Sequence, residues 1–223
     1  GCGHVFFDRL KQELLRYHYK IQCQRAYNLS KTLTYSINRF IKSDMQVDEN
    51  HRLSGCNWRP SSHFDDRPSR REIELIVLHC ISLPEGKFGH GYPEQLFLGT
   101  LKIEDDPSFS DLEGVRVAPH LYIDRKGNAT QFVSFDKRAW HAGVSSWRGR
   151  SNCNDFSIGI ELEGCVDAIF EEAQYKCLRK LLSALFLRYD RLSLEAIVGH
   201  NEIASDRKSD PGKDFEWLEV FKL

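Results

Sequence analysis

The chain has 223 residues, of which 41% are hydrophobic and 28% are charged, and this composition excludes a wholly disordered protein. Its 31 Lys and Arg side chains against 32 Asp and Glu leave a net charge of -1, so no overall charge draws it toward nucleic acid or acidic lipid. No run approaches the roughly 18 consecutive apolar residues of a membrane span. We therefore expect neither a nucleic-acid partner nor a membrane partner.

The seven cysteines are odd in number, and none belongs to a Cys-x-x-Cys pair. A disulfide framework favours an even, dense set of cysteines in a short secreted chain. The sequence also lacks a signal peptide with a basic start and an apolar middle. These features predict reduced thiols and a cytoplasmic location.

Residues 1–44 differ in charge from the rest of the chain. They contain eight Lys or Arg against three acidic side chains, or +5, which leaves -6 for the remainder. Phe7, Leu10 and Leu14 recur at helical spacing, which would suit a basic amphipathic helix, although the pattern drifts. The first residue is glycine and the only methionine is Met45, so the simplest interpretation is that translation begins at Met45. A genuine N-terminal extension is the alternative.

The first element predicted after this region is a strand over residues 72–79, followed by a short helix over 93–98 with proline in its first turn. A hairpin is predicted over 120–124 and 129–133, with Gly127 in its turn. A strand over 156–162, a helix over 171–189 with one apolar face, and a strand over 196–199 complete the pattern. Intermixed strands and helices predict an α/β (α+β mixed) fold with helices on both faces of a sheet.

Polar side chains interrupt three of the predicted strands. His79 and His200 are expected to close separate strands, Glu161 interrupts a third, and Asp210 follows His200 in a polar loop long enough to fold back. Two imidazoles and one carboxylate leave a fourth position on zinc open, as in catalytic sites. Spacing alone leaves a structural role for these residues equally open. The competing histidine ligands are His63, His90, His120 and His141.

The segment around Trp140 has a second candidate role. Ala139, Trp140 and His141 combine an aromatic, an imidazole and a small residue, and they would suit the wall of a ligand pocket. From the residues alone, a packed loop is the favoured alternative.

Four segments in the same order resemble the AmpD-type 1,6-anhydro-N-acetylmuramyl-L-alanine amidases: residues 79–84, 135–144, 153–164 and 199–212. That family belongs to the zinc amidase superfamily shared with peptidoglycan recognition proteins and phage amidases. The resemblance runs from about residue 52 to the C-terminus. It implies a single amidase domain over 52–223, with a central mixed β-sheet flanked by helices, and leaves residues 1–44 outside.

The resemblance also implies roles for individual residues. One zinc ion per chain would be bound by His79, His200 and Asp210, with Glu161 and Lys208 as the catalytic pair. The implied substrate-binding residues are Arg116, Ala139, Trp140 and His141. Two positions depart from the family pattern: Cys80 replaces a usual asparagine, and Asn152 stands where related amidases can have arginine.

The implied reaction is zinc-dependent hydrolysis of the amide between the lactyl group of (1,6-anhydro-)N-acetylmuramic acid and L-alanine. We expect a monomer that acts on anhydromuropeptide during cytosolic peptidoglycan recycling. Glu161 would act as general base and Lys208 would face the developing oxyanion. Two alternatives stay open, a non-catalytic muropeptide-binding module and a phage-type amidase that acts on intact wall.

Overall fold

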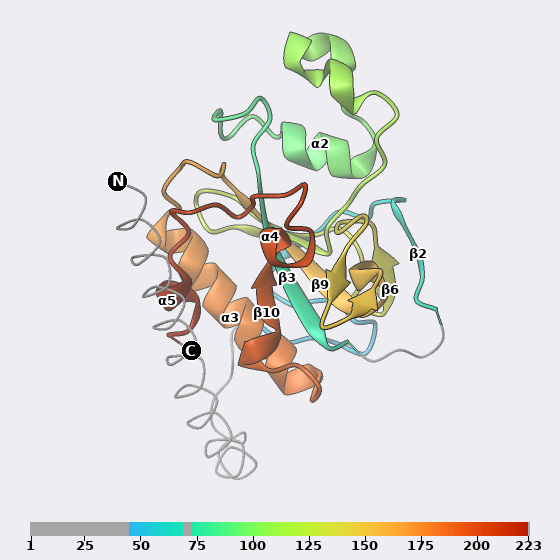
Figure 1. The fold of residues 1–223 in the computed structure, drawn as a ribbon, viewed down its shortest axis with the longest axis vertical. Coiled ribbons are helices and arrows are strands. Elements are labelled where there is room, and N and C mark those ends of the chain that lie inside the picture. Colours follow the sequence, from blue (N-terminus) through green and yellow to red (C-terminus); the bar gives the residue numbers. More distant parts are fainter. Residues whose placement is uncertain (1–44, 69–72, 223) are drawn as a thin grey trace.

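The computed structural model describes residues 45–68 and 73–222 of the chain (Figure 1). Residues 1–44, in which an amphipathic helix was one interpretation, lie outside the described residues, and so does Glu72 of the first predicted strand. None of the helices in the described ranges has the length and hydropathy that crossing a bilayer requires.

A six-stranded mixed sheet forms the centre of the molecule, in the order β1-β5-β4-β9-β3-β10. Its strands are β1 (Asn57–Trp58), β3 (Leu75–Ile81), β4 (Leu121–Ile123), β5 (Ala129–Gln131), β9 (Ser157–Glu163) and β10 (Ile197–Gly199). Only the β4–β5 pair is antiparallel, and it is the predicted hairpin. The other pairs, including β3 with β9 and with β10, are parallel. The expected mixed sheet flanked by helices is confirmed.

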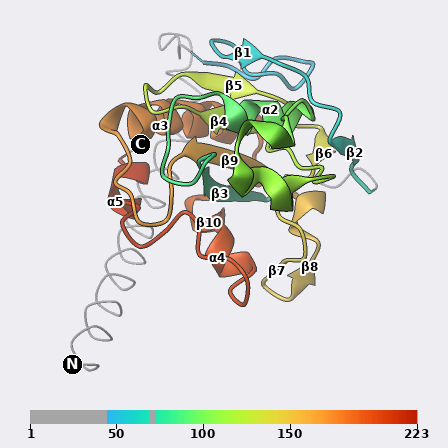
Figure 2. The same cartoon turned by 90° about the horizontal axis from the view of Figure 1, so that it is seen from above.

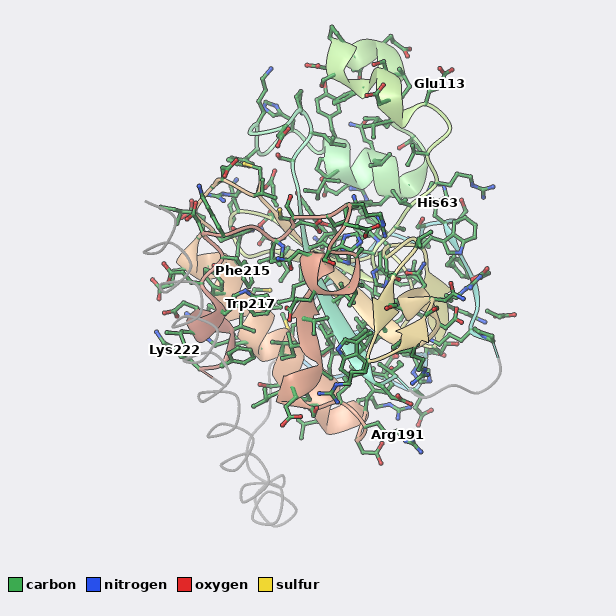
Figure 3. The ribbon with its side chains drawn as sticks, in the orientation of Figure 1. His63, Glu113, Arg191, Phe215, Trp217 and Lys222 are labelled. Atoms are coloured by element: carbon green, nitrogen blue, oxygen red, sulfur yellow. The ribbon has the colours of Figure 1, made fainter. Side chains whose placement is uncertain are left out.

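One face of the sheet packs against α3 (Glu172–Arg188), the long helix predicted over 171–189. Alternate residues of β3 and β9 point to it, among them Ile76 and Ile160, both fully buried. The helix begins with a capping box in which Gln174 accepts a hydrogen bond from the backbone N–H of Glu171, at 3.0 Å. Figure 3 shows Phe215 and Trp217 beside this helix, and Trp217 is the first residue of α5 (Trp217–Val220).

The opposite face is covered by short elements instead of a second long helix. The antiparallel pairs β2 (Phe64–Asp66) with β6 (Lys137–Ala139) and β7 (Ser146–Trp147) with β8 (Arg150–Ser151) lie on the side away from α3 (Figure 2). The remaining short helices are α2 (Tyr92–Leu98), α4 (His200–Ile203) and the 3-10 turns η1 (Ile103–Asp105), η2 (Pro107–Leu112), η3 (Cys153–Asp155) and η4 (Leu194–Ala196). α2 and the turns after it lie at the top of Figure 1, apart from α3. Helices therefore lie on both faces of the sheet, as predicted, but one face has the long helix α3 and the other has only short helices.

Two predicted boundaries differ from the structure, and both concern histidines. β3 continues to Ile81, so His79 lies inside the strand instead of closing it, because its ladder with β9 extends through the His79–Glu161 pair. β10 ends at Gly199, and His200 is the first residue of α4. The Gly199 N–H donates to the Glu202 carboxylate at 2.8 Å, and this cap starts the helix where the sequence suggested only a strand end.

Candidate metal centre and active site

The central strands bring the two predicted histidine ligands together. β3 and β10 are parallel neighbours in which Leu78 lies opposite Gly199, so the residues that follow, His79 and His200, are adjacent. Asp210 returns to the same place because the N–H of Asn201 donates to its backbone carbonyl at 3.0 Å. The loop after His200 therefore folds back as its length and polarity suggested.

The three side chains present a compact triangle of ligand atoms. His79 Nδ1 lies 3.0 Å from His200 Nδ1, and Asp210 Oδ2 lies 3.2 Å and 3.1 Å from these two nitrogens. Tetrahedral zinc with bonds near 2.0–2.1 Å would separate its ligands by about 3.3 Å. These residues thus fit a metal ion, and they form the one such His/Cys/Asp/Glu group found within residues 45–68 and 73–222.

The second nitrogen of each histidine faces a different partner. His200 Nε2 donates to the carbonyl of Ala142 at 3.1 Å, which leaves its Nδ1 unprotonated. His79 Nε2 lies 3.0 Å from His141 Nδ1. Burial, reinforced by His200, lowers the pKa of His79 to about 4 despite the opposing effect of Asp210. His79 is therefore suited to the neutral form that binds metal.

Asp210 supplies the negatively charged corner of the triangle. Burial favours its protonated form, but the close contacts with His200 and His79 outweigh this and bring the pKa of Asp210 below its usual range. The carboxylate is thus ionised throughout the neutral range, as a metal ligand must be.

Glu161 lies beside these residues on β9, directly opposite His79 in the ladder. Its Oε2 atom is inaccessible to solvent and has no hydrogen-bond partner within residues 45–68 and 73–222. Burial is the main cause that raises the pKa of Glu161 well above its usual value, and Asp210 adds to it while Lys208 opposes it. A carboxylate in this state takes up a proton readily, which is what a general base requires.

The predicted partner of Glu161 lies on the loop that leads to Asp210. Lys208 is exposed, its backbone N–H donates to the Ala204 carbonyl at 3.0 Å, and its charge acts on both Glu161 and His79. A solvent-facing ammonium at this position can meet a substrate that enters from outside.

The predicted substrate-binding residues occupy different depths. The Arg116 guanidinium carbon lies 5.3 Å from the ring centre of Trp140, which in turn stacks on His63 at 6.3 Å. Ala139 is fully buried among Phe97 and other apolar residues, so it presents no side chain to a ligand. His141 is partly buried and lies directly behind His79.

The other histidines considered as ligands have partners of their own. His63 Nδ1 donates to the carbonyl of Val117 at 3.0 Å, and His120 accepts from the N–H of Gly159 at 3.1 Å. His90 lies beside the ring of Tyr92. None of the three belongs to the described metal-ligating group.

The sequence did not predict the residues that form hydrogen bonds with His141 and Ala142, the direct partners of the two histidine ligands. Asn154 Oδ1 accepts from the backbone N–H of Ala142 at 2.8 Å and from that of His141 at 3.3 Å. Ser157 Oγ lies 3.1 Å from His141 Nε2. A hollow of about 340 Å³ beside Cys80 was also unforeseen, and η2 and residues 164–166 form part of its wall. No spacing pattern marks these residues, because they meet through long-range folding.

Comparison with known proteins identifies the class. Residues 69–213 match the family model described as N-acetylmuramoyl-L-alanine amidase, and the chain belongs to this family of hydrolases.

Its similar relatives include two enzymes named 1,6-anhydro-N-acetylmuramyl-L-alanine amidase AmpD. The one from Citrobacter freundii is 48% identical over 78% of this chain and 91% of its own length, and the one from Haemophilus influenzae is 46% identical over 74% and 90%. A solved structure of a selenomethionine AmpD derivative superposes with a TM-score of 0.75 at 44% identity, over 77% of this chain and 96% of that one. AmpDh3 of Pseudomonas aeruginosa, solved with anhydromuramic pentapeptide, gives 0.52 at 26% identity, over 79% and 65%.

Proposed function

We propose that the protein hydrolyses the amide between the lactyl group of 1,6-anhydro-N-acetylmuramic acid and the L-alanine of the stem peptide, in cytoplasmic recycling of peptidoglycan. The observation that carries this proposal is the buried Oε2 of Glu161, which has no hydrogen-bond partner among the described residues, beside the triangle of His79, His200 and Asp210. Family membership supports the amide as the bond cleaved. The names of the relatives at 46–48% identity support the anhydro sugar.

We assign one zinc ion per chain to His79, His200 and Asp210. Two nitrogens and one oxygen with an open fourth position are the donor set of catalytic zinc. Zinc at this position would supply Lewis-acid polarisation of the amide carbonyl and make water nucleophilic near neutral pH. The neutral state of His79 and the ionised state of Asp210 suit this assignment.

The protein's own side chains handle the proton and the developing charge. Glu161 takes the proton from the attacking water and later donates it to the nitrogen of the departing L-alanine. Its raised pKa suits both steps, because the carboxyl must accept a proton and keep it until the C–N bond breaks. The Lys208 ammonium stabilises the negative charge that grows on the carbonyl oxygen.

Arg116, Ala139, Trp140 and His141 form the substrate-binding side of this proposal. Arg116 and Trp140 lie next to each other and can contact the muropeptide with a cation and an aromatic face. Ala139 can contribute only through its backbone, because its side chain is buried. The active unit is a monomeric amidase domain over residues 52–223.

A comparison of two substrates tests the proposal against both alternatives. Soluble anhydromuropeptide and polymeric murein are each incubated with the zinc-loaded protein, and release of free stem peptide is measured. We expect rapid release from the soluble substrate and little from the polymer. Binding without release would indicate a recognition module, and a preference for the polymer would indicate a wall-acting amidase. Either result contradicts the proposal.

A further inference from the structure

We propose that His141 is a positioning residue for the metal ligand His79, which it orients through a hydrogen bond between the two rings. This inference rests on the proposed function, because it assumes that His79 binds a metal. It gives His141 a role toward the metal ligand His79, in addition to the substrate-binding role proposed above.

The proton positions follow from the hydrogen-bond partners. His79 can direct a lone pair from Nδ1 toward a metal only if its proton is on Nε2. The acceptor within reach of that proton is His141 Nδ1, at 3.0 Å. His141 then carries its own proton on Nε2, which donates to Ser157 Oγ at 3.1 Å. In the series of hydrogen bonds from His79 through His141 to Ser157, each donor therefore faces an acceptor.

The surroundings of the His141 ring favour this single orientation. Its ring is nearly perpendicular to that of His79, with 82° between the planes and 5.1 Å between the centres. A Cβ atom added to Gly159 on β9 would lie 2.3 Å from Cγ of His141, so this glycine provides the space that the ring occupies. Any larger residue at Gly159 would displace the ring from its partner.

The same short segment supports the second histidine ligand. The carbonyl of Ala142 accepts from His200 Nε2, while the side chain of His141 accepts from His79 Nε2. Asn154 fixes both residues through their backbone N–H groups. Residues 141 and 142 therefore orient both imidazole ligands from one rigid position, as outer partners of metal ligands commonly do.

Two substitutions at His141 separate positioning from bulk. His141→Phe keeps an aromatic ring but removes the acceptor, and we expect zinc affinity, measured by competition with a chelator, to fall roughly 10–100-fold. His141→Asn keeps an acceptor near the position of Nδ1, and we expect affinity within about threefold of the unmodified protein. His51→Phe is the matched control, because it removes a partly buried histidine that contacts the Tyr189 hydroxyl at 2.7 Å, away from the metal-ligating group.

Additional measurements decide between the possible outcomes. The absorption spectrum of the cobalt-substituted protein should change in His141→Phe and not in His51→Phe. Unchanged zinc affinity and spectrum in His141→Phe, with only a higher KM, would overturn the proposal in favour of a substrate contact. If His141→Phe does not fold, Ser157→Ala tests the last hydrogen bond of the same series. Unchanged zinc affinity in Ser157→Ala would count against the positioning role of His141. Failure of the unmodified protein to bind zinc would instead contradict the proposed function.

Discussion

At the scale of single residues, two glutamates on β9 differ in their surroundings and therefore in their chemistry. Glu163 accepts hydrogen bonds from the backbone N–H groups of Gly89 and Arg125, at 2.5 Å and 3.0 Å, which occupies both of its oxygens. Glu161 has an oxygen without a hydrogen-bond partner in the described part of the chain, and a raised pKa. The family resemblance implied Glu161 as the base, and the hydrogen-bond pattern favours Glu161 over Glu163.

Substitution of Glu161 by glutamine should separate metal binding from the chemical step. The amide keeps the shape of the side chain but cannot take up the proton of the attacking water. We expect the turnover number to fall on the order of a hundredfold or more, with zinc content unchanged. Measured turnover of anhydromuropeptide and metal analysis of the same sample provide the test.

Glu163→Gln is the matched control for this prediction. It changes a neighbouring carboxylate of the same strand whose partners are backbone groups, so it should affect stability more than turnover. Normal turnover in Glu161→Gln together with a large loss in Glu163→Gln would reverse the assignment of the base.

At the scale of elements, the hairpin turn between β4 and β5 packs against the start of α3. Gly127 has φ +80°, and a Cβ atom at this position would lie 2.5 Å from the backbone oxygen of Ala173. Gly114 also has a positive φ, of +72°, but a Cβ atom there would meet no atom of the described residues within 4 Å. A side chain at either glycine would strain the backbone, but only a side chain at Gly127 would also overlap with a neighbouring segment.

Alanine substitutions at these two glycines should have unequal costs. Gly114→Ala should lower the free energy of unfolding by about 1–2 kcal/mol, the cost of a left-handed backbone with a side chain. Gly127→Ala should cost about 1–3 kcal/mol more, because α3 must shift. Urea denaturation of both variants measures the difference. Equal losses would contradict the close contact between the turn and the helix.

The elements show which structural features the sequence could predict. α3 was predictable because its apolar residues follow the helical period. β3 was predictable because it is a nearly continuous apolar run, and β9 because its isoleucine and leucine residues recur at every second position. β1, β2, β6, β7 and β8 have only two or three residues each, too few for any periodicity. The metal ligands could be proposed from residue type and family resemblance. The support from Asn154 and Ser157 could not, because it depends on distant segments that meet only in the fold.

At the scale of the whole molecule, buried neutral histidines link folding to pH. His120 is completely buried, and this burial, reinforced by the charge of Arg67, lowers its pKa to about 3. The unfolded chain binds this proton below about pH 6.5, while the folded protein excludes it until near pH 3. Stability from this residue is therefore present above pH 6.5 and declines as the pH falls toward 3.

Replacement of His120 should flatten the pH profile of stability. Between about pH 7.5 and pH 5, His120 should cost the unmodified protein on the order of 2 kcal/mol of unfolding free energy. His120→Gln lacks this titration, so its free energy of unfolding should change less over the same interval, although its value at neutral pH is lower. Denaturant titrations at both pH values test this. Parallel profiles for the two proteins would exclude His120 as a source of the dependence.

The activity proposed for the whole molecule depends on one metal site, in which His79, His200 and Asp210 bind the zinc ion required for amide hydrolysis. The most direct measurement is hydrolysis of anhydromuropeptide by the protein before chelation, after complete removal of metal, and after addition of one equivalent of zinc. We predict that activity is lost on removal and recovered with zinc, and that Asp210→Ala shows no recovery at the same zinc concentration. Full activity of the metal-free protein would contradict the account.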